Sequence, residues 1–332
     1  MKVKLSMVAQ AAGVSPSTVS RILNGTAHVD PEKHARVMAI IKELGFRPNP
    51  AARALAGGKT STVGVITQFI DSPFYGEALR GIEDVLTAAH YVPLFASGHW
   101  NEKNEHDCID FLRQRKVDGI IALSSCLPDE ALVSIAQDTP TVITGRQLAA
   151  HNVTSIDFDN MRAARLAVEH LLELGHRHIA YISGPMHHSD ARERLAGYRA
   201  ALAKGASIDP RLVVEADYLE DGGMIAMNQL LQTGVKFTAV VTGNDQMAFG
   251  ARLALHRKGL RVPQDISLVG FDDLPIAQYL TPPLTTVRHS ARELGAQAAQ
   301  SVLALIAGKP LEHPVLEARL MVRESTSAAN DR

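Results

Sequence analysis

The fold of the N-terminal part is decided by the stretch "VAQAAGVSPSTVSRILNG", residues 8–25. Gly13 ends a first short helix, for which Ser6 supplies the cap, because glycine accepts the positive φ of a helix stop without steric cost. Ser15 caps a second helix, and Pro16 takes its first position, where the missing N–H does no harm. Two short helices joined by a tight glycine turn predict a helix-turn-helix unit.

A third helix follows in "VDPEKHARVMAIIKELGF", residues 29–46, which repeats the same pattern. Asp30 caps it, Pro31 comes next, and Gly45 ends it. Apolar residues three to four apart place an inward stripe on the helices. We expect these stripes to form one small core from Val8, Ala9, Ala12, Val19, Ile22, Leu23, Val37, Ile40, Ile41 and Leu44.

The charge of the chain is unevenly distributed. Residues 1–60 contain nine Lys and Arg against three Asp and Glu, whereas the whole chain has a net charge of −1, so the remainder carries −7. A basic segment joined to an acidic body indicates a module that binds a polyanion. The alternative is a chance clustering of charge.

The second helix carries side chains suited to DNA. In a helix-turn-helix unit the N-terminal end of this helix enters the major groove. Arg21 can bond a guanine edge through two hydrogen bonds, and Ser17 can contact a base or a phosphate. Side chains that suit phosphate oxygens are Thr18, Ser20 and Asn24. The alternative is that these polar residues form an ordinary solvated helix face.

The stretch "NPAARALAGGKTS", residues 49–61, lies between the basic segment and the body. Its "GKT" resembles the end of a phosphate-binding loop, but such a loop needs a glycine where the chain has Arg53, and a strand before it rather than after it. The stretch instead predicts a short helix with Asn49 as its cap and Pro50 in its first turn. About seven residues are too few to be helical alone, so we expect a joint that orders only on docking.

The stretch "VAQAAGVSPSTVSRILNG" followed by "RPNPAARALA" resembles the DNA-binding end of the lactose/galactose-repressor (LacI/GalR) family of bacterial transcription regulators. The resemblance implies a helix-turn-helix domain at 1–48, and a hinge helix and linker at 49–60 that folds on DNA and wedges Leu55 into the minor groove. Two residues depart from the family pattern: Met7, and Pro16, which offers a base only an apolar contact and so leaves operator preference open. The DNA contacts that the resemblance implies are Ser6, Ser15, Pro16, Ser17, Thr18, Ser20, Arg21, Asn24, His28, Asn49, Ala52, Arg53 and Leu55.

Beyond residue 60, apolar runs alternate with amphipathic stretches. The runs interpreted as buried strands lie at 62–67, 92–97, 118–125, 140–145, 178–185, 213–218, 237–245 and 266–273. The helical stretches lie at 73–90, 102–116, 129–137, 160–174, 190–204, 222–233 and 246–259. This alternation predicts doubly wound parallel sheets, and two series of it, with crossovers near 157–163 and 285–292, predict two similar α/β lobes around a cleft.

The residues that end these runs are polar or aromatic, and ligands of open parallel sheets bind beyond the carboxyl ends of the strands. They are Gln68, residues 71–75, Arg146, Arg192, Arg194, Tyr218, Asn244, Asp245, Asp272, Asp273 and His289. Their polar groups can bond the hydroxyls of a polyhydroxylated ligand, and their rings can pack on its apolar face. Taken singly, Asp272 or Asn244 can instead cap a helix, and Arg194 can be an ordinary surface or salt-bridged arginine.

Resemblance to the same family extends over essentially the whole chain, through "ARLAVEHLLELGHRHIAYISGP", "RERLAGYRAAL", "NDQMAFGA", "ISLVGFDD" and "PPLTTV". It implies that residues 61–332 form an effector-binding and dimerisation core of the periplasmic-binding-protein type. Arg146 and His289 stand where the family varies, and an arginine at 146 can pair with a carboxylated or phosphorylated ligand. By position, the effector contacts are Gln68, Ser72, Phe74, Arg146, Phe158, Arg194, Tyr218, Asn244, Asp272 and His289.

We therefore expect a sequence-specific transcriptional repressor of a carbohydrate-utilisation operon, controlled by a sugar or sugar-derived effector between the two lobes. The effector can alternatively be a non-sugar metabolite such as a purine or a sugar acid. A solute-binding protein fits the core, but not the DNA-reading helices or the missing secretion signal. An enzyme is the third alternative, but the sequence has no nucleophile elbow, zinc spacing or intact phosphate loop, so we expect no catalytic residue, cofactor or metal.

The expected partners are a pseudo-palindromic double-stranded DNA operator and a second copy of the chain, since a two-fold operator mirrors a two-fold dimer. "TSAANDR" at the C-terminal end contains no leucine heptads, which the tetramer-forming family members carry, so a homodimer is the expected assembly. Two cysteines without disulfide or metal spacing, and no apolar run of about 18 residues, favour the cytoplasm and no membrane partner. Histidines such as His176 and His178 are expected to be structural.

Overall fold

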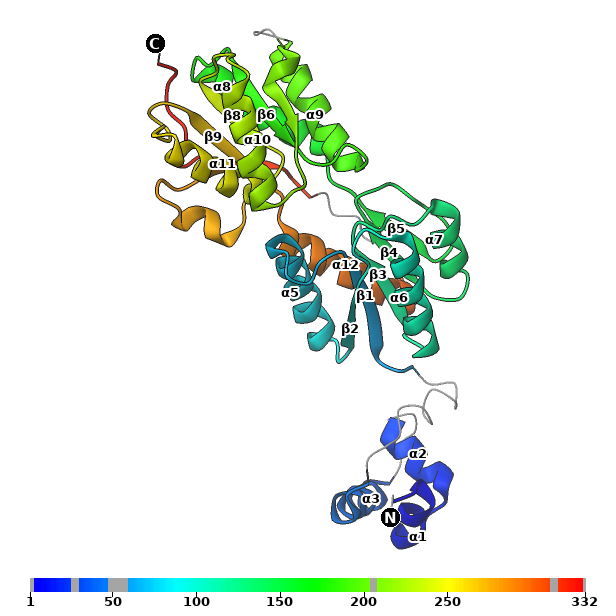
Figure 1. Cartoon of the computed structure of the whole chain (residues 1–332). Coiled ribbons are helices and arrows are strands. Elements are labelled where there is room, and N and C mark those ends of the chain that lie inside the picture. Colours follow the sequence, from blue (N-terminus) through cyan, green and yellow to red (C-terminus); the bar gives the residue numbers. More distant parts are fainter. Residues whose placement is uncertain (1–2, 25–29, 47–58, 204–207, 311–315, 331–332) are drawn as a thin grey trace. The chain divides into compact units, whose positions relative to one another are not determined.

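The computed structural model describes residues 3–24, 30–46, 59–203, 208–310 and 316–330. The chain forms two compact units, Met1–Thr60 and Ser61–Arg332 (Figure 1). The predicted hinge helix lies outside the described residues. So do five of the residues predicted to contact DNA, which are His28, Asn49, Ala52, Arg53 and Leu55.

The first unit contains the helices α1 (Leu5–Ala12), α2 (Pro16–Asn24) and α3 (Pro31–Leu44). Gly13 and Gly45 end α1 and α3 with a φ of +62° each, the left-handed conformation that favours glycine. The Ser15 hydroxyl accepts the backbone N–H of Thr18 at 3.2 Å, and Asp30 accepts two backbone N–H groups of α3. These caps and stops confirm the predicted helix pattern.

Ser6 does not cap α1, contrary to the prediction. The helix already begins at Leu5, with Lys4 at the N-cap, and Ser6 lies exposed in the first turn. The physical reason is that Leu5 packs against the core of the unit, so the helix starts early enough to place it there. That core is made of Val8, Ala9, Ala12, Val19, Ile22, Val37 and Phe46, with Leu23, Ile40, Ile41 and Leu44 at its edge.

The second unit contains two sheets, and Figure 1 shows them as two lobes. In the N-lobe the strand order is β2–β1–β3–β4–β5, and the neighbouring strands run parallel. Its strands are β1 (Thr62–Thr67), β2 (Val92–Ser97), β3 (Gly119–Ala122), β4 (Thr141–Thr144) and β5 (Val153–Ile156). The helices between them are α5 (Pro73–Ala88), α6 (Glu102–Gln114) and α7 (Asp129–Ala136).

In the C-lobe the strand order is β11–β10–β9–β8–β6–β7, parallel except for β11. Its strands are β6 (Ile179–Ser183), β7 (Val213–Glu215), β8 (Ala239–Thr242), β9 (Ser267–Asp272), β10 (Thr285–Arg288) and β11 (Arg319–Met321). Its helices are α8 (Asn160–Glu173), α9 (Ser189–Leu202), η1 (Pro210–Leu212), α10 (Glu220–Gln232), α11 (Asp245–Arg257) and η2 (Pro275–Tyr279).

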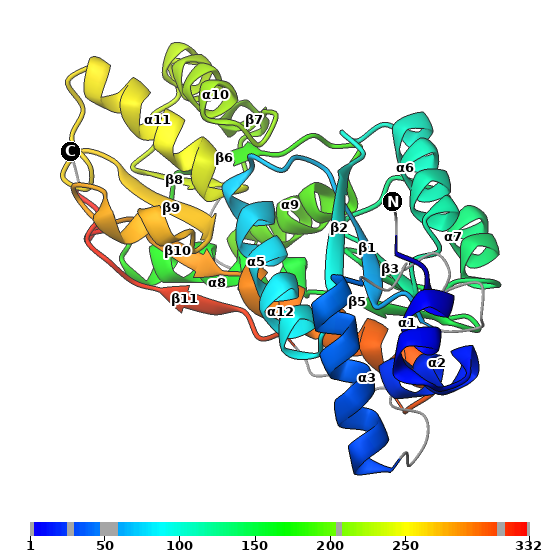
Figure 2. The same cartoon turned by 90° about the horizontal axis from the view of Figure 1, so that it is seen from below.

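Helix α12 (Ala291–Ile306) follows β10 of the C-lobe but packs against α5 of the N-lobe (Figure 2). The two helices meet through glycines. A Cβ atom on Gly295 would lie 2.0 Å from the carbonyl oxygen of Ala78, and one on Gly81 would lie 2.1 Å from that of Arg292. The chain therefore passes between the lobes after β5, after β10 and again after α12.

All eight predicted strands and all seven predicted helices of the body are present, and β1 and β2 have the predicted bounds. β5, β10 and α12 were not predicted. Residues 285–288 form β10, although they lie inside a stretch interpreted as a crossover. This strand was not predicted because "TTVR" is too short and too polar to read as a buried strand. Among the described residues, no helix is both long enough and apolar enough to span a bilayer.

Candidate effector cleft and DNA-reading helix

Helix α2 presents hydroxyl groups and one arginine to solvent. Ser15, Ser17 and Arg21 are exposed, and Ser20 is half-buried. The Ser15 hydroxyl lies 2.8 Å from that of Ser17 and 2.9 Å from that of Thr18. The first turn of α2 contains no acidic residue, so the positive end of the helix dipole is not neutralised by its own sequence. This end of α2 suits a phosphate backbone, with Arg21 one turn further on.

Arg194 is the charged centre of the carboxyl edge of the C-lobe. Its side chain is buried, and its guanidinium donates to Asn160 Oδ1 at 2.9 Å and to the carbonyl oxygen of Gly243 at 2.6 Å. The guanidinium lies 3.6 Å from the carboxylate of Asp190 and over the ring of Phe271, 3.9 Å from its centroid. A buried arginine with these partners is not an ordinary surface residue.

Tyr218 and Asn244 lie beside this arginine. The Tyr218 hydroxyl donates to Asp190 at 2.9 Å, and burial, with Asp190 adding to it, raises the Tyr218 pKa well above its usual value. Asn244 Oδ1 accepts the backbone N–H of Met247 and so caps α11, as the alternative interpretation held. The Asn244 amide also donates to the Tyr218 carbonyl oxygen at 2.9 Å. Asn244 therefore holds the loop that carries Tyr218.

Asp272 ends β9 in a strained conformation. Its φ is +112°, and that of Asp273 is +57°, values that residues other than glycine rarely adopt. The buried carboxylate of Asp245 holds this pair, because it accepts the backbone N–H of Leu274 at 2.8 Å and the hydroxyl of Thr286 at 2.6 Å. The Thr286 hydroxyl in turn accepts the N–H of Asp273 at 3.3 Å.

Arginines and a glycine complete the support of this strained pair. Arg288 and Arg323 donate to the two carboxylate oxygens of Asp273 at 2.7 and 2.5 Å. A Cβ atom on Gly270 would lie 2.1 Å from Asp245 Oδ1, so only glycine leaves room for that carboxylate. Burial raises the pKa of Asp272 well above its usual range, against the opposing effect of Arg194.

Gln68, at the end of β1, is fully buried, and its amide is occupied by protein groups. Its Nε2 donates to Glu105 at 2.9 Å and to the carbonyl oxygen of Ser124 at 3.1 Å, and its Oε1 accepts the backbone N–H of Trp100 at 2.7 Å. Gln68 thus positions the loop after β2. Its contact with an effector stays a prediction.

Arg146 is held by the loop that follows β3. It donates to the carbonyl oxygens of Leu127 and Ser125 and pairs with Asp129 at 2.9 Å. The positive charge proposed to meet an anionic ligand therefore already has an acidic partner. Ser72 stands at the N-cap of α5, and its contact with an effector also stays a prediction.

Aromatic rings line the approach between the lobes. The His289 ring stacks on Phe158 at 3.9 Å between centroids and lies 5.1 Å from Phe74 of the N-lobe. Both ring nitrogens of His289 are buried, and neither has a hydrogen-bond partner within the described ranges. Burial, with Arg194 adding to it, lowers the His289 pKa to about 3, so the ring is neutral. A neutral imidazole can both donate to and accept from a ligand hydroxyl.

Three residues beside these were not among the predicted contacts: Trp100, His188 and Asp190. Trp100 follows β2, so the strand-end rule could have found it, whereas His188 and Asp190 come four or more residues after β6. Tyr75 was included only within the stretch 71–75. Burial raises its pKa, and Asp190, Asp272 and Arg194 also act on it, which places its hydroxyl near the C-lobe charges.

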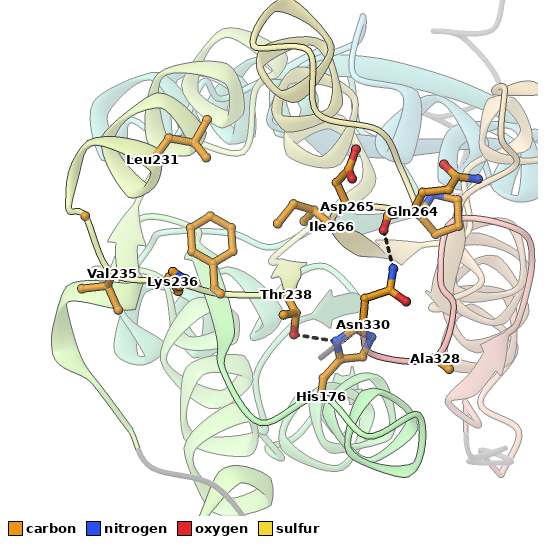
Figure 3. Close-up of a pocket in the computed structure, with 13 residues that line it drawn as sticks. His176, Leu231, Val235, Lys236, Thr238, Gln264, Asp265, Ile266, Ala328 and Asn330 are labelled. Carbon is orange, nitrogen blue, oxygen red and sulfur yellow. Dashed lines mark hydrogen bonds between the residues drawn. The ribbon is translucent and has the colours of Figure 1, made fainter. Parts of the chain in front are cut away.

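A hollow of about 340 Å³ lies at the opposite, amino edge of the C-lobe sheet (Figure 3). His176 lies in it with both ring nitrogens bonded, to the Thr238 hydroxyl at 2.7 Å and to the Ser327 carbonyl oxygen at 3.0 Å. Burial lowers the pKa of His176. This histidine is structural, as expected, and the hollow is separate from the residues predicted to bind an effector.

A helix-turn-helix unit together with a two-lobed parallel α/β core defines the class of ligand-responsive DNA-binding proteins. Residues 4–49 match the family described as bacterial regulatory proteins, lacI family, and residues 168–326 match the periplasmic binding protein-like domain. The HTH-type transcriptional regulator GalR of Escherichia coli (strain K12) is 37% identical over 306 residues, 92% of this chain and 89% of that protein.

The solved structures that resemble essentially the whole chain include a lac repressor and a CelR complex. The lac repressor dimer bound to operator and the anti-inducer ONPF has a TM-score of 0.88 at 31% identity, and covers 99% of this chain and 100% of that one. The transcriptional regulator CelR–cellobiose complex has a TM-score of 0.71 at 34% identity, and the match covers 97% of this chain and 99% of the CelR chain. The chain belongs to the lacI family of bacterial regulatory proteins, and it is a DNA-binding transcriptional regulator.

Proposed function

We propose that this protein represses a carbohydrate-utilisation operon and that a sugar bound between its lobes controls the repression. The observation that carries the proposal is the set of groups around the buried Arg194, in which two carboxylates, one guanidinium and the Phe271 ring lie together. Hydroxyl groups of a sugar can bond such charged groups, while the C–H faces of its ring pack on aromatic side chains.

The charge of this set favours a neutral sugar over a sugar acid. Asp190 lies 3.6 Å from the single guanidinium of Arg194, so that positive charge already has an acidic partner. Arg146, the other candidate to meet an anion, pairs with Asp129. An anionic ligand would therefore meet repulsion that a neutral polyol avoids.

The relatives support the partners that we propose. The similar CelR structure holds cellobiose, and the similar lac repressor structure is a dimer on its operator. We infer that this chain acts as a homodimer on a pseudo-palindromic operator, in the bacterial cytoplasm, and carries out no catalysis. A solute-binding role does not account for the helix-turn-helix unit.

Control by the ligand requires different affinities for two arrangements of the lobes, since a ligand that binds both equally shifts nothing. A coupling of about 1–3 kcal/mol is typical of such regulators. We propose that the stretch 49–60, as a hinge helix that folds on DNA, connects the lobes to the operator, with Leu55 as its wedge.

The test uses an operator selected by the full-length protein from a pool of random duplexes. D-galactose, D-ribose, cellobiose and D-gluconate are then added, and thermal shift and operator release are measured. We expect one of the neutral sugars to raise the melting temperature and to change operator affinity. Deleting residues 1–60 should abolish operator binding and leave sugar binding intact; loss of both would contradict the separation of the two functions.

A further inference from the structure

Rings from the two lobes meet at Trp100 and His188. Their centroids lie 4.1 Å apart, with an angle of 61° between the ring planes. Trp100 lies in the loop between β2 and α6 of the N-lobe, and His188 directly precedes α9 of the C-lobe, so this contact bridges the cleft. We propose that Trp100 closes over the effector cleft against His188 and selects ligands that offer an apolar ring face. The inference rests on the proposed function, because it places the effector in this cleft.

The backbone of Trp100 is held in position by the buried carboxylate of Glu105, which acts through Gln68. His99 and Trp100 both have positive φ, of +56° and +53°, which residues of these types rarely adopt. Gln68 accepts the Trp100 N–H at 2.7 Å and is itself held by Glu105 at 2.9 Å. Glu105 packs on Gly98, where a Cβ atom would lie 2.4 Å from Glu105 Cγ. A strained loop with this much support marks a side chain whose direction matters.

His188 is held in place on the other lobe. Arg192 donates to the carbonyl oxygens of Met186 and His187 at 2.9 and 2.8 Å, and so fixes the loop before α9. The His187 ring lies 4.1 Å from that of His188, and the Tyr218 ring lies 6.3 Å from it. The Trp100 indole therefore contacts a histidine that the C-lobe already holds in position.

Trp100 is the end of a row of rings that runs along the cleft. Between ring centroids, Tyr75 lies 6.4 Å from Trp100 and 5.5 Å from Phe74. The Phe74 ring in turn lies 5.1 Å from the ring of His289. Charges of the C-lobe, those of Asp272 and Arg194, act on the Tyr75 hydroxyl in the middle of this row. A ligand bonded to those charges would have its ring faces against the row, an arrangement that suits the C–H face of a pyranose.

The contact can be tested without any ligand, because the chain contains one tryptophan and its fluorescence reports on Trp100 alone. Acrylamide quenching is measured for the full-length wild type, for His188→Ala, and for His256→Ala, which changes an exposed histidine of α11. We expect a red-shifted emission and at least twofold stronger quenching in His188→Ala, and wild-type behaviour in His256→Ala. Equal quenching in His188→Ala and the wild type would overturn the closure.

The selectivity is tested with D-galactose, D-ribose, cellobiose and D-gluconate by calorimetry. For each sugar that binds the wild type, Trp100→Ala should raise the Kd at least tenfold, and Trp100→Phe, which keeps a ring, should stay within about threefold. Wild-type sugar affinity in Trp100→Ala would overturn the role of the indole. If none of the four sugars binds the wild type, the sugar-effector proposal fails, and the quenching experiment still decides the closure.

Discussion

The Thr286 hydroxyl donates to the buried Asp245 carboxylate at 2.6 Å, and this single bond ties β10 to the first turn of α11. The same hydroxyl accepts the N–H of Asp273. The strained turn that carries Asp272 is therefore held from a neighbouring strand. In the N-lobe, the buried Glu105 carboxylate holds the loop of Trp100 in a similar way, because it accepts a hydrogen bond from Gln68, which in turn accepts the Trp100 N–H. Each lobe thus uses a buried carboxylate to hold a positive-φ pair at its carboxyl edge.

Thr286→Val should weaken the response to sugar. Valine keeps the shape of threonine but leaves a buried oxygen of Asp245 without its donor, which costs about 1–3 kcal/mol. We expect a lower free energy of unfolding in urea and a higher sugar concentration for half-maximal operator release. Thr286→Ser keeps the hydroxyl and should behave like the wild type. Equal losses in the two variants would assign the effect to packing instead.

Asp245 should make stability fall as the pH rises toward neutrality. Burial raises its pKa from 3.8 to about 7 in the folded protein, so the folded state holds this proton more tightly than the unfolded chain. Its contribution is therefore full below pH about 4 and is lost as the pH rises through about 7, at up to about 1.4 kcal/mol per pH unit. Urea unfolding at a series of pH values between 4 and 8 gives the free energy of unfolding at each pH. This free energy should fall less steeply with rising pH for Asp245→Asn than for the wild type. A steeper slope in the variant would contradict this assignment.

Asp272→Ala should cripple the response to sugar and leave operator affinity unchanged. The substitution removes a buried carboxylate next to Arg194, at the edge where we place the effector. We expect at least about a tenfold weaker sugar affinity by calorimetry, a loss of about 1.4 kcal/mol. Asp221→Ala on the exposed side of α10 is the matched control and should bind normally. A wild-type induction curve for Asp272→Ala would move the site elsewhere.

Gly295→Ala should destabilise the contact between α12 and α5. The new Cβ would lie 2.0 Å from the carbonyl oxygen of Ala78, so the helices must move apart, at about 1–3 kcal/mol. Gly76→Ala in α5 is the control, because a Cβ there meets nothing within 4 Å. Alanine at this helical position should be neutral or stabilising by about 0.5–1 kcal/mol. Chemical denaturation measures the free energy of unfolding of both variants. A wild-type value for Gly295→Ala would show that the helices can separate without cost.

Arg21→Ala should weaken specific operator binding by about 1–3 kcal/mol and relax the sequence preference at one base pair. The reason is the loss of two hydrogen bonds to a guanine edge from the exposed face of α2. Competition between the selected operator and single-base variants measures it. A uniform loss on every sequence would mean that Arg21 contacts phosphate.

Much of the fold follows from local patterns along the chain. Caps and glycine stops predict the helices of the first unit because their hydrogen bonds reach only two to four residues. Ser6 is the exception, since packing of Leu5 moved the start of α1. The strands of the body stand out as apolar runs, whereas β10 is short and polar and was missed.

The candidate site could be predicted only in part. Asp272 ends β9, so the strand-end rule found it, whereas Arg194 lies inside α9 and its prediction rested on the resemblance to the family; both are buried at the predicted edge. The same rule cannot say how a side chain is used. Gln68 ends a strand as well, but its amide is bonded to Glu105 and to the Trp100 backbone.

The sequence by itself determined the helix-turn-helix pattern, the alternation of strands and helices, and the edge where polar side chains gather, because each depends on neighbours within a few residues. Only the tertiary structure decided that α12 returns to pack on α5, that Asp245 supports Asp272, and that Trp100 meets His188. These contacts join residues far apart in the chain, and no local period or cap encodes which distant side chain will arrive at the same place.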